Sequence, residues 1–180
     1  MTPNHLETPR LLLRPFELSD APAVQRLAGA IEIARVTLNV PHPYEDGMAE
    51  QWIERQQRPE NRAHTSNFAI TQRENSELCG CIGLSVNQKQ SQAELGYWIG
   101  VPFWNLGYGT EAARAIIGFA FETLQLERVQ ARHLDINPAS GRVMQKIGMQ
   151  FEGISRKGAR KGNTFYDLAH YAILREDWQG

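Results

Sequence analysis

Two glycines stand two residues apart directly before a helical pattern, in the segment WNLGYGTEAARAIIGFAF (residues 104–121). Apolar residues then recur every three or four positions, which predicts a helix with one face buried on a sheet. They are Ala113, Ile116, Ile117, Ala120, Phe121 and Leu124. A helix start carries unpaired amides and a partial positive charge, and glycine lets an anion approach that backbone closely. The segment predicts either a phosphate-binding turn or a tight packing turn before a core helix.

Two common phosphate-binding motifs do not fit this segment. A nucleotide-triphosphate loop ends in Gly-Lys-Ser/Thr, whereas Gly109 is followed by Thr110 and Glu111. A dinucleotide motif has a third glycine where Ala112 stands, and it belongs to repeated βαβ units that the other patterns do not indicate. The diphosphate of coenzyme A is the third candidate.

The remaining patterns predict an α/β (α+β) fold in which helices flank a central sheet. The predicted strands are residues 8–16, three antiparallel segments within 64–100, and residues 128–134, 149–157 and 164–176. The predicted helices are residues 19–29, 48–57, the segment after the two glycines, and 137–148. We therefore expect a mixed, mostly antiparallel, twisted sheet of about seven strands with about four helices. The proline-rich stretch 36–47 predicts a loop at the rim of a substrate site.

Composition favours one globular domain over residues 1–180, because this length suits one hydrophobic core. The formal net charge of -1 provides no field for a nucleic-acid backbone, so we expect no specific nucleic-acid partner. The basic run at residues 156–162 lies between two predicted strands and indicates a solvated hairpin. Without a signal-peptide or transmembrane pattern, we expect a cytoplasmic protein that does not bind membranes. Cys79, Cys81 and the scattered histidines lack metal-ligand spacing, so we expect core thiols and no metal.

The segment ELGYWIGVPFWNLGYGTEA resembles the acetyl-CoA signature of the GNAT N-acetyltransferase superfamily. The chain as a whole resembles the RimJ/RimL-type branch, which contains ribosomal-protein alanine N-acetyltransferases. TPRLLLRPF, INPASGRVMQKIGMQFEG and YDLAHYAILREDW match that branch in order over almost the whole length. The resemblance implies the GNAT fold and direct transfer of an acetyl group from acetyl-CoA to a primary amine. Two positions depart from the family: Trp104 replaces a usual Gln or Arg, and Met144 replaces a tyrosine that often acts as general acid.

The resemblance also implies where acetyl-CoA binds. Its diphosphate would bond the amides of the glycine turn, which are those of Leu106, Gly107, Tyr108, Gly109 and Thr110. Its pantetheine arm would bond main-chain groups near Trp98, Ile99 and Val101, where an amide polarises the thioester carbonyl as an oxyanion hole does. Arg142 and Lys146 share one helix face, and they either reach the phosphates of the cofactor or form a solvated basic face.

Three residues are candidates for the chemistry. Alternation along the predicted strand sets Glu94 on the face opposite Leu95, and Glu94 is the candidate base that draws a proton from the amine through water. The alternative is an ordinary carboxylate on a wet sheet face. Asn137 before Pro138 is a helix start, and the family places this Asn near the cofactor. Ser140 matches the serine of the N-x-x-S motif of the branch, where it would donate a hydrogen bond to the departing thiolate.

The free energy needed to deprotonate the acceptor amine at neutral pH distinguishes two classes of acceptor. The pKa of an α-amino group is about 7.9 and that of a lysine side chain about 10.4, a difference of about 3.4 kcal/mol. One candidate base is better suited to the α-amine. The RimJ/RimL-type resemblance implies the same class of acceptor, so the leading expectation is the N-terminus of a ribosomal or other protein. The alternatives are an enzyme for a small-molecule amine (amino acid, polyamine or antibiotic) and a non-catalytic acetyl-CoA-binding regulator. Some relatives dimerise, and the sequence leaves a homodimer open.

Overall fold

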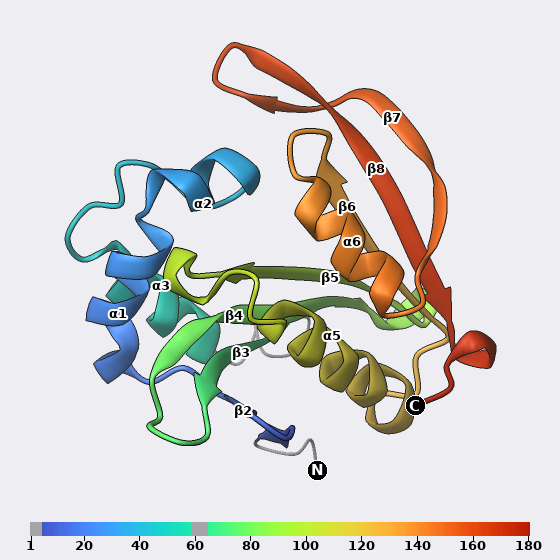
Figure 1. Cartoon of the computed structure of the whole chain (residues 1–180), viewed down its shortest axis with the longest axis horizontal. Helices are drawn as coiled ribbons and strands as arrows, with labels where there is room; N and C mark the ends of the chain where they lie inside the picture. The colour runs from blue at the N-terminus through green and yellow to red at the C-terminus, as the bar shows by residue number, and fades with distance from the viewer. Residues whose placement is uncertain (1–4, 59–64) are drawn as a thin grey trace.

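The computed structural model describes residues 5–58 and 65–180, and its centre is a sheet of eight strands (Figure 1). The strands are β1 (Leu6–Glu7), β2 (Leu11–Arg14), β3 (Thr65–Gln72), β4 (Leu78–Asn87), β5 (Gln92–Ile99), β6 (Arg128–Leu134), β7 (Gln150–Lys161) and β8 (Thr164–Leu174). Their order across the sheet is β1-β2-β3-β4-β5-β6-β8-β7. Within the described residues, β5 and β6 are parallel and the other neighbours are antiparallel.

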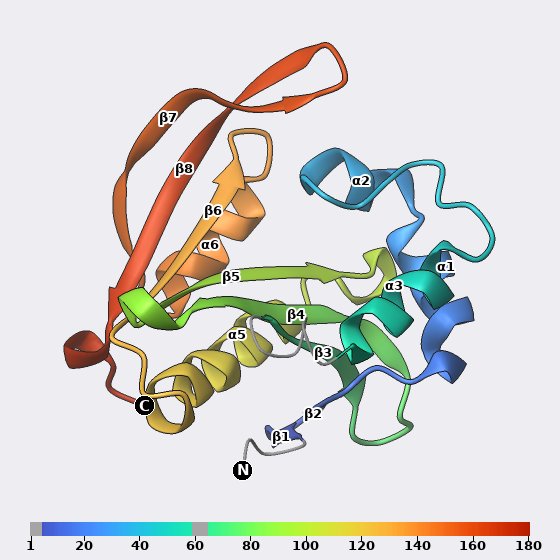
Figure 2. The same cartoon turned by 180° about the vertical axis from the view of Figure 1, so that it is seen from behind.

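Helices cover both faces of the sheet around β4. They are α1 (Ala21–Ala28), α2 (Ile31–Val36), α3 (Met48–Gln57), α5 (Tyr108–Gly118), which continues as a π-helical turn over Phe119–Thr123, and α6 (Pro138–Lys146). Helix α5 packs on one face, and α1 and α3 pack on the other (Figure 1, Figure 2). Successive side chains of a strand alternate between the faces, yet the first seven residues of β4 are all buried. Cover on both sides explains why LCGCIGL is continuously apolar.

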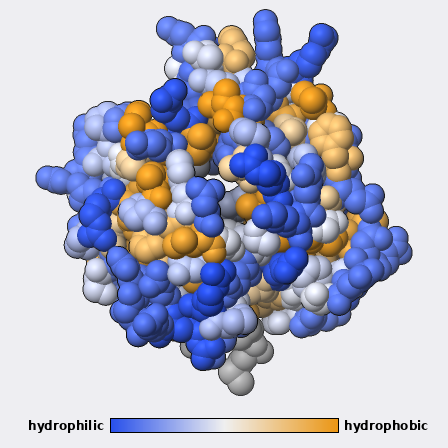
Figure 3. Space-filling view, viewed as in Figure 1, coloured by the Kyte–Doolittle hydropathy of each residue, from blue (hydrophilic) through white to orange (hydrophobic). Residues whose placement is uncertain are grey.

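Strands β5 and β6 begin as neighbours and then diverge. Their register runs from Gln92 opposite Arg128 to Leu95 opposite Ala131. Beyond this point β5 still pairs with β4 as far as Ile99, and β6 still pairs with β8 as far as Leu134. The sheet therefore opens into a fork with residues 96–99 on one arm and 132–134 on the other (Figure 1). Figure 3 shows a hollow near the centre of the same view of the surface.

Helix α2 is tied to the β7–β8 hairpin and to the loop before α6, at the open end of the fork. The Lys161 ammonium group donates to the carbonyl oxygens of Ala34 and of Thr37, the latter at 2.6 Å, and burial lowers the pKa of Lys161. The Asn137 side-chain amide donates to the carbonyl oxygen of Val36 at 3.3 Å. These bonds satisfy carbonyl groups at the end of α2 that have no partner within the helix.

The expected fold class is confirmed, and the structure adds two short elements. The predicted first strand is shortened to β2, and β1 precedes it, which makes eight strands where about seven were expected. Helix α2 was not predicted and gives five α-helices in the described part of the chain, where about four were expected. The basic run 156–162 lies in β7 and the turn to β8, as a hairpin requires.

Cys79 and Cys81 are free and buried, as expected of core thiols. Burial raises the pKa of each to about 12, so both stay protonated and unreactive near neutral pH.

An ion pair fixes α1 to β2. The Arg14 guanidinium donates to both carboxylate oxygens of Asp20 at 2.8 Å, and Asp20 also accepts from the Glu17 amide at 2.8 Å. Burial alone would raise the pKa of Asp20, but the bonds from Arg14 and Glu17 outweigh it and lower the pKa below its usual value. A carboxylate with a lowered folded pKa stabilises the protein above its unfolded pKa, and this contribution is lost as the pH falls through the folded pKa.

We expect Asp20→Asn to reduce the free energy of unfolding by about 2 kcal/mol near pH 7. The difference from wild type should shrink below about pH 4, where Asp20 of the wild type also becomes protonated. Urea unfolding at a series of pH values checks this, with the exposed Asp177→Asn as control. A loss that stays constant down to about pH 2 would assign the effect to packing and not to the charge of Asp20.

Candidate functional site

Helix α5 begins at a turn in which Gly107 adopts the left-handed conformation, with φ of 83°. The first backbone bond of the helix runs from the Glu111 amide to the Gly107 carbonyl oxygen, at 3.1 Å. The amides of Tyr108, Gly109 and Thr110 precede this bond, so they have no carbonyl partner within the helix. Three such amides at the positive end of the helix dipole can bind an anion.

Gly109 opens this helix start toward the fork. A Cβ atom at Gly109 would lie 3.5 Å from Tyr97 Cε2, 3.6 Å from Ile99 Cγ1 and 3.9 Å from Val143 Cγ2. Tyr97 and Ile99 belong to β5 and Val143 to α6, so a longer side chain here would extend into the space between the two elements. Glycine keeps this space free beside the unpaired amides.

The two glycines, equivalent in the sequence pattern, differ in the structure. Gly107 has a positive φ that other residues rarely adopt, and a Cβ atom there would lie 3.3 Å from Arg10 Nη2. Gly109 shows only ordinary contacts. A substitution at Gly107 therefore strains the backbone, whereas one at Gly109 tests the open space.

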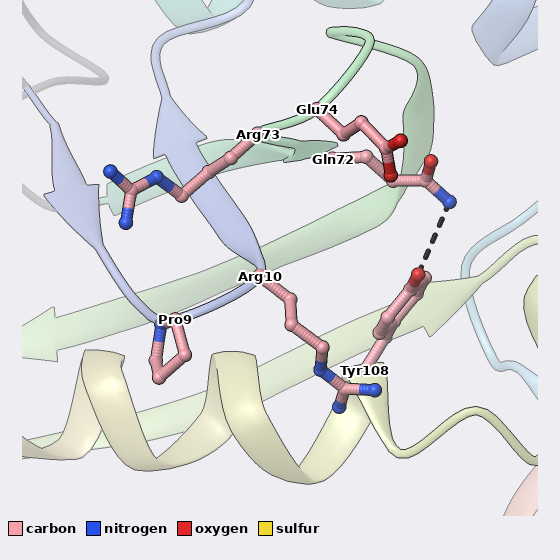
Figure 4. Close-up of a pocket in the computed structure, with 6 residues that line it drawn as sticks. All are labelled: Pro9, Arg10, Gln72, Arg73, Glu74 and Tyr108. Carbon is pink, nitrogen blue, oxygen red and sulfur yellow. Dashed lines mark hydrogen bonds between the residues drawn. The ribbon is translucent and has the colours of Figure 1, made fainter.

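Arg10, just before β2, lies beside Tyr108 at the start of α5 and holds the glycine turn (Figure 4). Its guanidinium donates to the Leu106 carbonyl oxygen at 2.9 Å and to Glu111 Oε2 at 2.7 Å, and it lies 4.9 Å from the centre of the Tyr108 ring. The cavity on this side measures about 560 Å³ and is lined by Pro9, Arg10, Gln72, Arg73, Glu74 and Tyr108. The contacts of Arg10 with Leu106, Tyr108 and Glu111 therefore support the shape of the turn. The sequence gave no signal for the contact between Arg10 and Glu111, because the two residues are far apart in the chain.

Trp104, which departs from the family pattern, ties the turn back to β5. Its indole Nε1 donates to the Ile99 carbonyl oxygen at 2.6 Å. A carbonyl oxygen has two lone pairs, so one remains for another donor. Ile99 is buried, while Trp98 and Val101 are partly exposed beside the fork.

Two hydroxyl groups meet across the side of the fork that faces α6. The Tyr97 hydroxyl of β5 lies 3.0 Å from Ser140 Oγ in the first turn of α6. Burial raises the pKa of Tyr97, and the bond to Ser140 offsets this only in part. Sequence reasoning missed Tyr97, because alternation assigned it a face but no partner. Met144, the position of the family's usual tyrosine, is buried in the core.

Asn137 has the capping role that the sequence predicted. Its side-chain oxygen accepts from the Ser140 amide at 3.2 Å, which fixes the first turn of α6. With its amide group on Val36, this side chain orients Ser140 and connects α6 to α2.

An ion pair crosses the apex of the fork on the opposite face. Arg132 Nε lies 2.8 Å from Glu94 Oε1, and the two side chains are 42% and 36% exposed, so solvent reaches both. Glu94 comes just before the last paired residue of β5, and Arg132 just after that of β6. Ser155 Oγ and His170 Nε2, 2.8 Å apart, lie on the same polar face. Figure 2 shows β6 and β8 toward the viewer on this side.

Arg142 and Lys146 are exposed on α6. The α6 residue that reaches Gly109 is Val143, and the Lys146 carbonyl oxygen accepts from Arg114 of α5 at 3.0 Å. The structure thus joins α6 to α5 beside the glycine turn and leaves the side chains of Arg142 and Lys146 exposed.

Over residues 5–58 and 65–180, no helix has the length and apolarity needed to cross a membrane. In the same ranges, no three His, Cys, Asp or Glu residues gather as metal ligands would.

Comparisons with known proteins agree with this geometry. Residues 10–150 match the profile of the acetyltransferase (GNAT) domain family. The chain is 32% identical over 174 residues to the uncharacterized N-acetyltransferase YnaD of Bacillus subtilis (strain 168), covering 97% of this chain and 99% of YnaD. It is 38% identical over 104 residues to "Putative ribosomal N-acetyltransferase YdaF" of the same organism, covering 57% of each protein.

Among solved structures, RimL in complex with coenzyme A, described as a ribosomal L7/L12 alpha-N-protein acetyltransferase, has the same fold. It superposes with a TM-score of 0.86 at 16% identity, over 94% of this chain and 97% of RimL. Since the family profile spans more than half of the chain and YnaD aligns along nearly all of it, the chain belongs to the GNAT acetyltransferase family and is an acetyl-CoA-dependent N-acetyltransferase.

Proposed function

We propose that this enzyme, acting as a single domain, acetylates the N-terminal α-amine of a protein, with acetyl-CoA and the acceptor entering the fork from opposite faces. One observation supports this most strongly: the helix start at Gly109 opens on one face of the fork, while Glu94 lies at its apex on the other. The two reactants then need not compete for one entrance.

On the α5 and α6 side, the glycine turn is the proposed diphosphate site. The amides from Leu106 to Thr110 would bond the diphosphate, as the helix start and the space beside Gly109 favour. Beyond Leu95, the edge of β5 that faces β6 has lost its strand partner. Its main-chain groups near Trp98, Ile99 and Val101 are the proposed partners of the pantetheine arm, because an extended ligand can pair with a free strand edge.

Two cationic side chains of α6 are a further proposed contact with the cofactor. Arg142 and Lys146 are both exposed, and their positive charge suits the phosphate groups. This proposal rests on charge and on their shared helix.

On the opposite face, Glu94 is the proposed general base. It would take a proton, through water, from the attacking amine as the new C–N bond forms. The C–S bond breaks and the electron pair leaves with the sulfur, toward which Ser140 would donate a hydrogen bond. The pKa of an alkyl thiol is about 8.5, so the departing thiolate needs only modest help. Asn137 contributes by holding the first turn of α6, and hence Ser140, in place.

The acceptor class rests on the amine chemistry and on the relatives. An α-amine costs less to deprotonate at neutral pH than a lysine side chain. The printed descriptions of YdaF and RimL name a ribosomal N-acetyltransferase and an alpha-N-protein acetyltransferase, which supports a protein N-terminus. The bonds from Lys161 to α2 join the β7–β8 hairpin to α2 at the open end of the fork. A connection at this end would restrict entry of a large acceptor, which favours the alternative, a small-molecule amine.

Thiol release from acetyl-CoA distinguishes the two acceptor classes. The panel comprises peptides with free N-termini, the same peptides with blocked N-termini, polyamines and amino acids. We expect turnover with free N-termini and none with the blocked peptides. Turnover with the polyamines or amino acids alone would contradict a protein acceptor and support a small-molecule amine.

Gly109→Glu tests the proposed diphosphate site. The new side chain would fill the space beside the unpaired amides and repel the diphosphate, so the Kd for acetyl-CoA should rise about 100-fold. Gly118→Glu adds the same charge to α5 at a position with only ordinary contacts, and it should bind acetyl-CoA as the wild type does. Calorimetry measures the Kd of both variants for acetyl-CoA. Equal Kd values would show that the diphosphate does not bind at this turn.

Glu94→Gln tests the proposed base. An α-amine is mostly protonated near pH 7 and mostly neutral near about pH 9, so the loss of turnover should be larger at the lower pH, about 100-fold. Glu152→Gln is the matched control, because Glu152 is a paired carboxylate on the same polar face, bonded to Arg128 at 2.6 Å. Initial rates over this pH range provide the comparison. The same factor at both pH values would exclude Glu94 as the base.

A further inference from the structure

The hydroxyl pair of Tyr97 and Ser140 joins the two sides of the fork. Tyr97 projects from the β5 arm, and Ser140 stands in the first turn of α6, which packs on β6. Their oxygen atoms are 3.0 Å apart, and either can donate. The Tyr97 ring also contacts the space beside Gly109, since a Cβ atom there would lie 3.5 Å from it. Tyr97 thus lines the path from the glycine turn to Ser140.

The direction of the hydrogen bond decides what Ser140 can do. If Ser140 donates to Tyr97, its single hydrogen is used and only its lone pairs face the fork. If Tyr97 donates to Ser140 Oγ, the hydrogen of Ser140 is free to point elsewhere. A negative charge that develops in the fork favours the second arrangement, because each hydroxyl in such a chain polarises the next.

We propose that Tyr97 is a positioning residue whose phenol donates to Ser140 Oγ, so that the hydroxyl hydrogen of Ser140 points at the sulfur of coenzyme A. The proposal rests on the proposed function in one respect: it takes the fork as the site of the thioester. It explains how a chain with Met144 in place of the family's tyrosine supports its leaving group. No proton leaves Tyr97: the C–S bond breaks, the electron pair stays on sulfur, and the hydrogen-bond chain stabilises the thiolate.

The environment of Tyr97 suits a fixed donor. Because burial raises its pKa, the phenol remains protonated across the physiological pH range and retains its hydrogen. The backbone around Ser140 is fixed as well, by the Asn137 cap and by the tie to Val36. Both partners are held before any ligand arrives.

A double-mutant cycle tests whether Tyr97 acts through Ser140. We expect Tyr97→Phe to lower kcat about fivefold without changing the Kd for acetyl-CoA, since one neutral hydrogen bond is lost and the ring stays. In the Ser140→Ala background the same substitution should change kcat less than about twofold. Tyr171→Phe is the matched control: Tyr171 of β8 is buried, and its hydroxyl accepts a hydrogen bond from Gln145 of α6 at 3.5 Å and not from Ser140.

A binding measurement provides a readout that needs no acceptor. Near pH 9 most coenzyme A is thiolate, because its thiol has a pKa of about 8.5. We expect Tyr97→Phe and Ser140→Ala each to weaken coenzyme A binding about fivefold at this pH, and neither to weaken binding of desulfo-coenzyme A. Calorimetry with both ligands separates contact with the sulfur from a general change in the site.

The outcomes separate this proposal from the proposed function. An equal effect of Tyr97→Phe with and without Ser140 would overturn the proposal, as would an equal loss of both ligands or no effect at all. If no amine in the panel were acetylated, the proposed function would be contradicted. Binding of coenzyme A and of desulfo-coenzyme A would still test the role of Tyr97. The positioning role is established if Tyr97→Phe weakens binding of coenzyme A but not of desulfo-coenzyme A, and lowers kcat only when Ser140 is present.

Discussion

The parallel pairing of β5 with β6 stops after Leu95 and Ala131, and the rest of the site depends on that stop. A continued pair would use the facing main-chain groups of both strands and leave no space between them. Here β4 holds β5 as far as Ile99, and β8 holds β6 as far as Leu134. The arms therefore stay ordered while the edges that face each other are available to a ligand.

Strand alternation then separates two kinds of chemistry. On β5, Tyr97 projects toward α6 and bonds Ser140, whereas Glu94 projects to the other face and pairs with Arg132. The first face also contains the start of α5, whose unpaired amides suit a diphosphate. The second is polar and solvent-exposed, which suits the proposed entry of the amine. A three-residue spacing on one strand thus places a proposed base and a hydrogen-bonded hydroxyl on opposite sides of one opening.

The local parts of this site could be predicted from the sequence, because they depend on neighbouring residues. The glycine pattern predicted the start of α5, Asn137 before Pro138 predicted the cap of α6, and residues 128–134 were predicted as the strand that forms β6. Helix α2 was missed because six residues are too few to show a helical period. The end of the β5–β6 pairing could not be predicted either, since the alternation of apolar and polar residues within each strand does not reveal where two strands stop pairing.

The contacts between side chains could not be predicted, because they join residues that are far apart in the sequence. Arg10 meets Glu111, Tyr97 meets Ser140 and Lys161 meets α2 only because the chain folds back on itself. Trp104 was recognised as a departure from the family, but its bond to Ile99 required the structure. Of the predicted site residues, the glycine turn, Glu94 and Ser140 border the fork, whereas Arg142 and Lys146 project into solvent on α6.

The most direct test of the central claim is hydrogen exchange at single amides of α5, followed by NMR with and without acetyl-CoA. We expect the amides of Tyr108, Gly109 and Thr110, which have no partner within the helix, to exchange more slowly when acetyl-CoA is bound. Unchanged exchange at these three amides in a protein that demonstrably binds acetyl-CoA would place the diphosphate elsewhere and contradict the site derived from the fork.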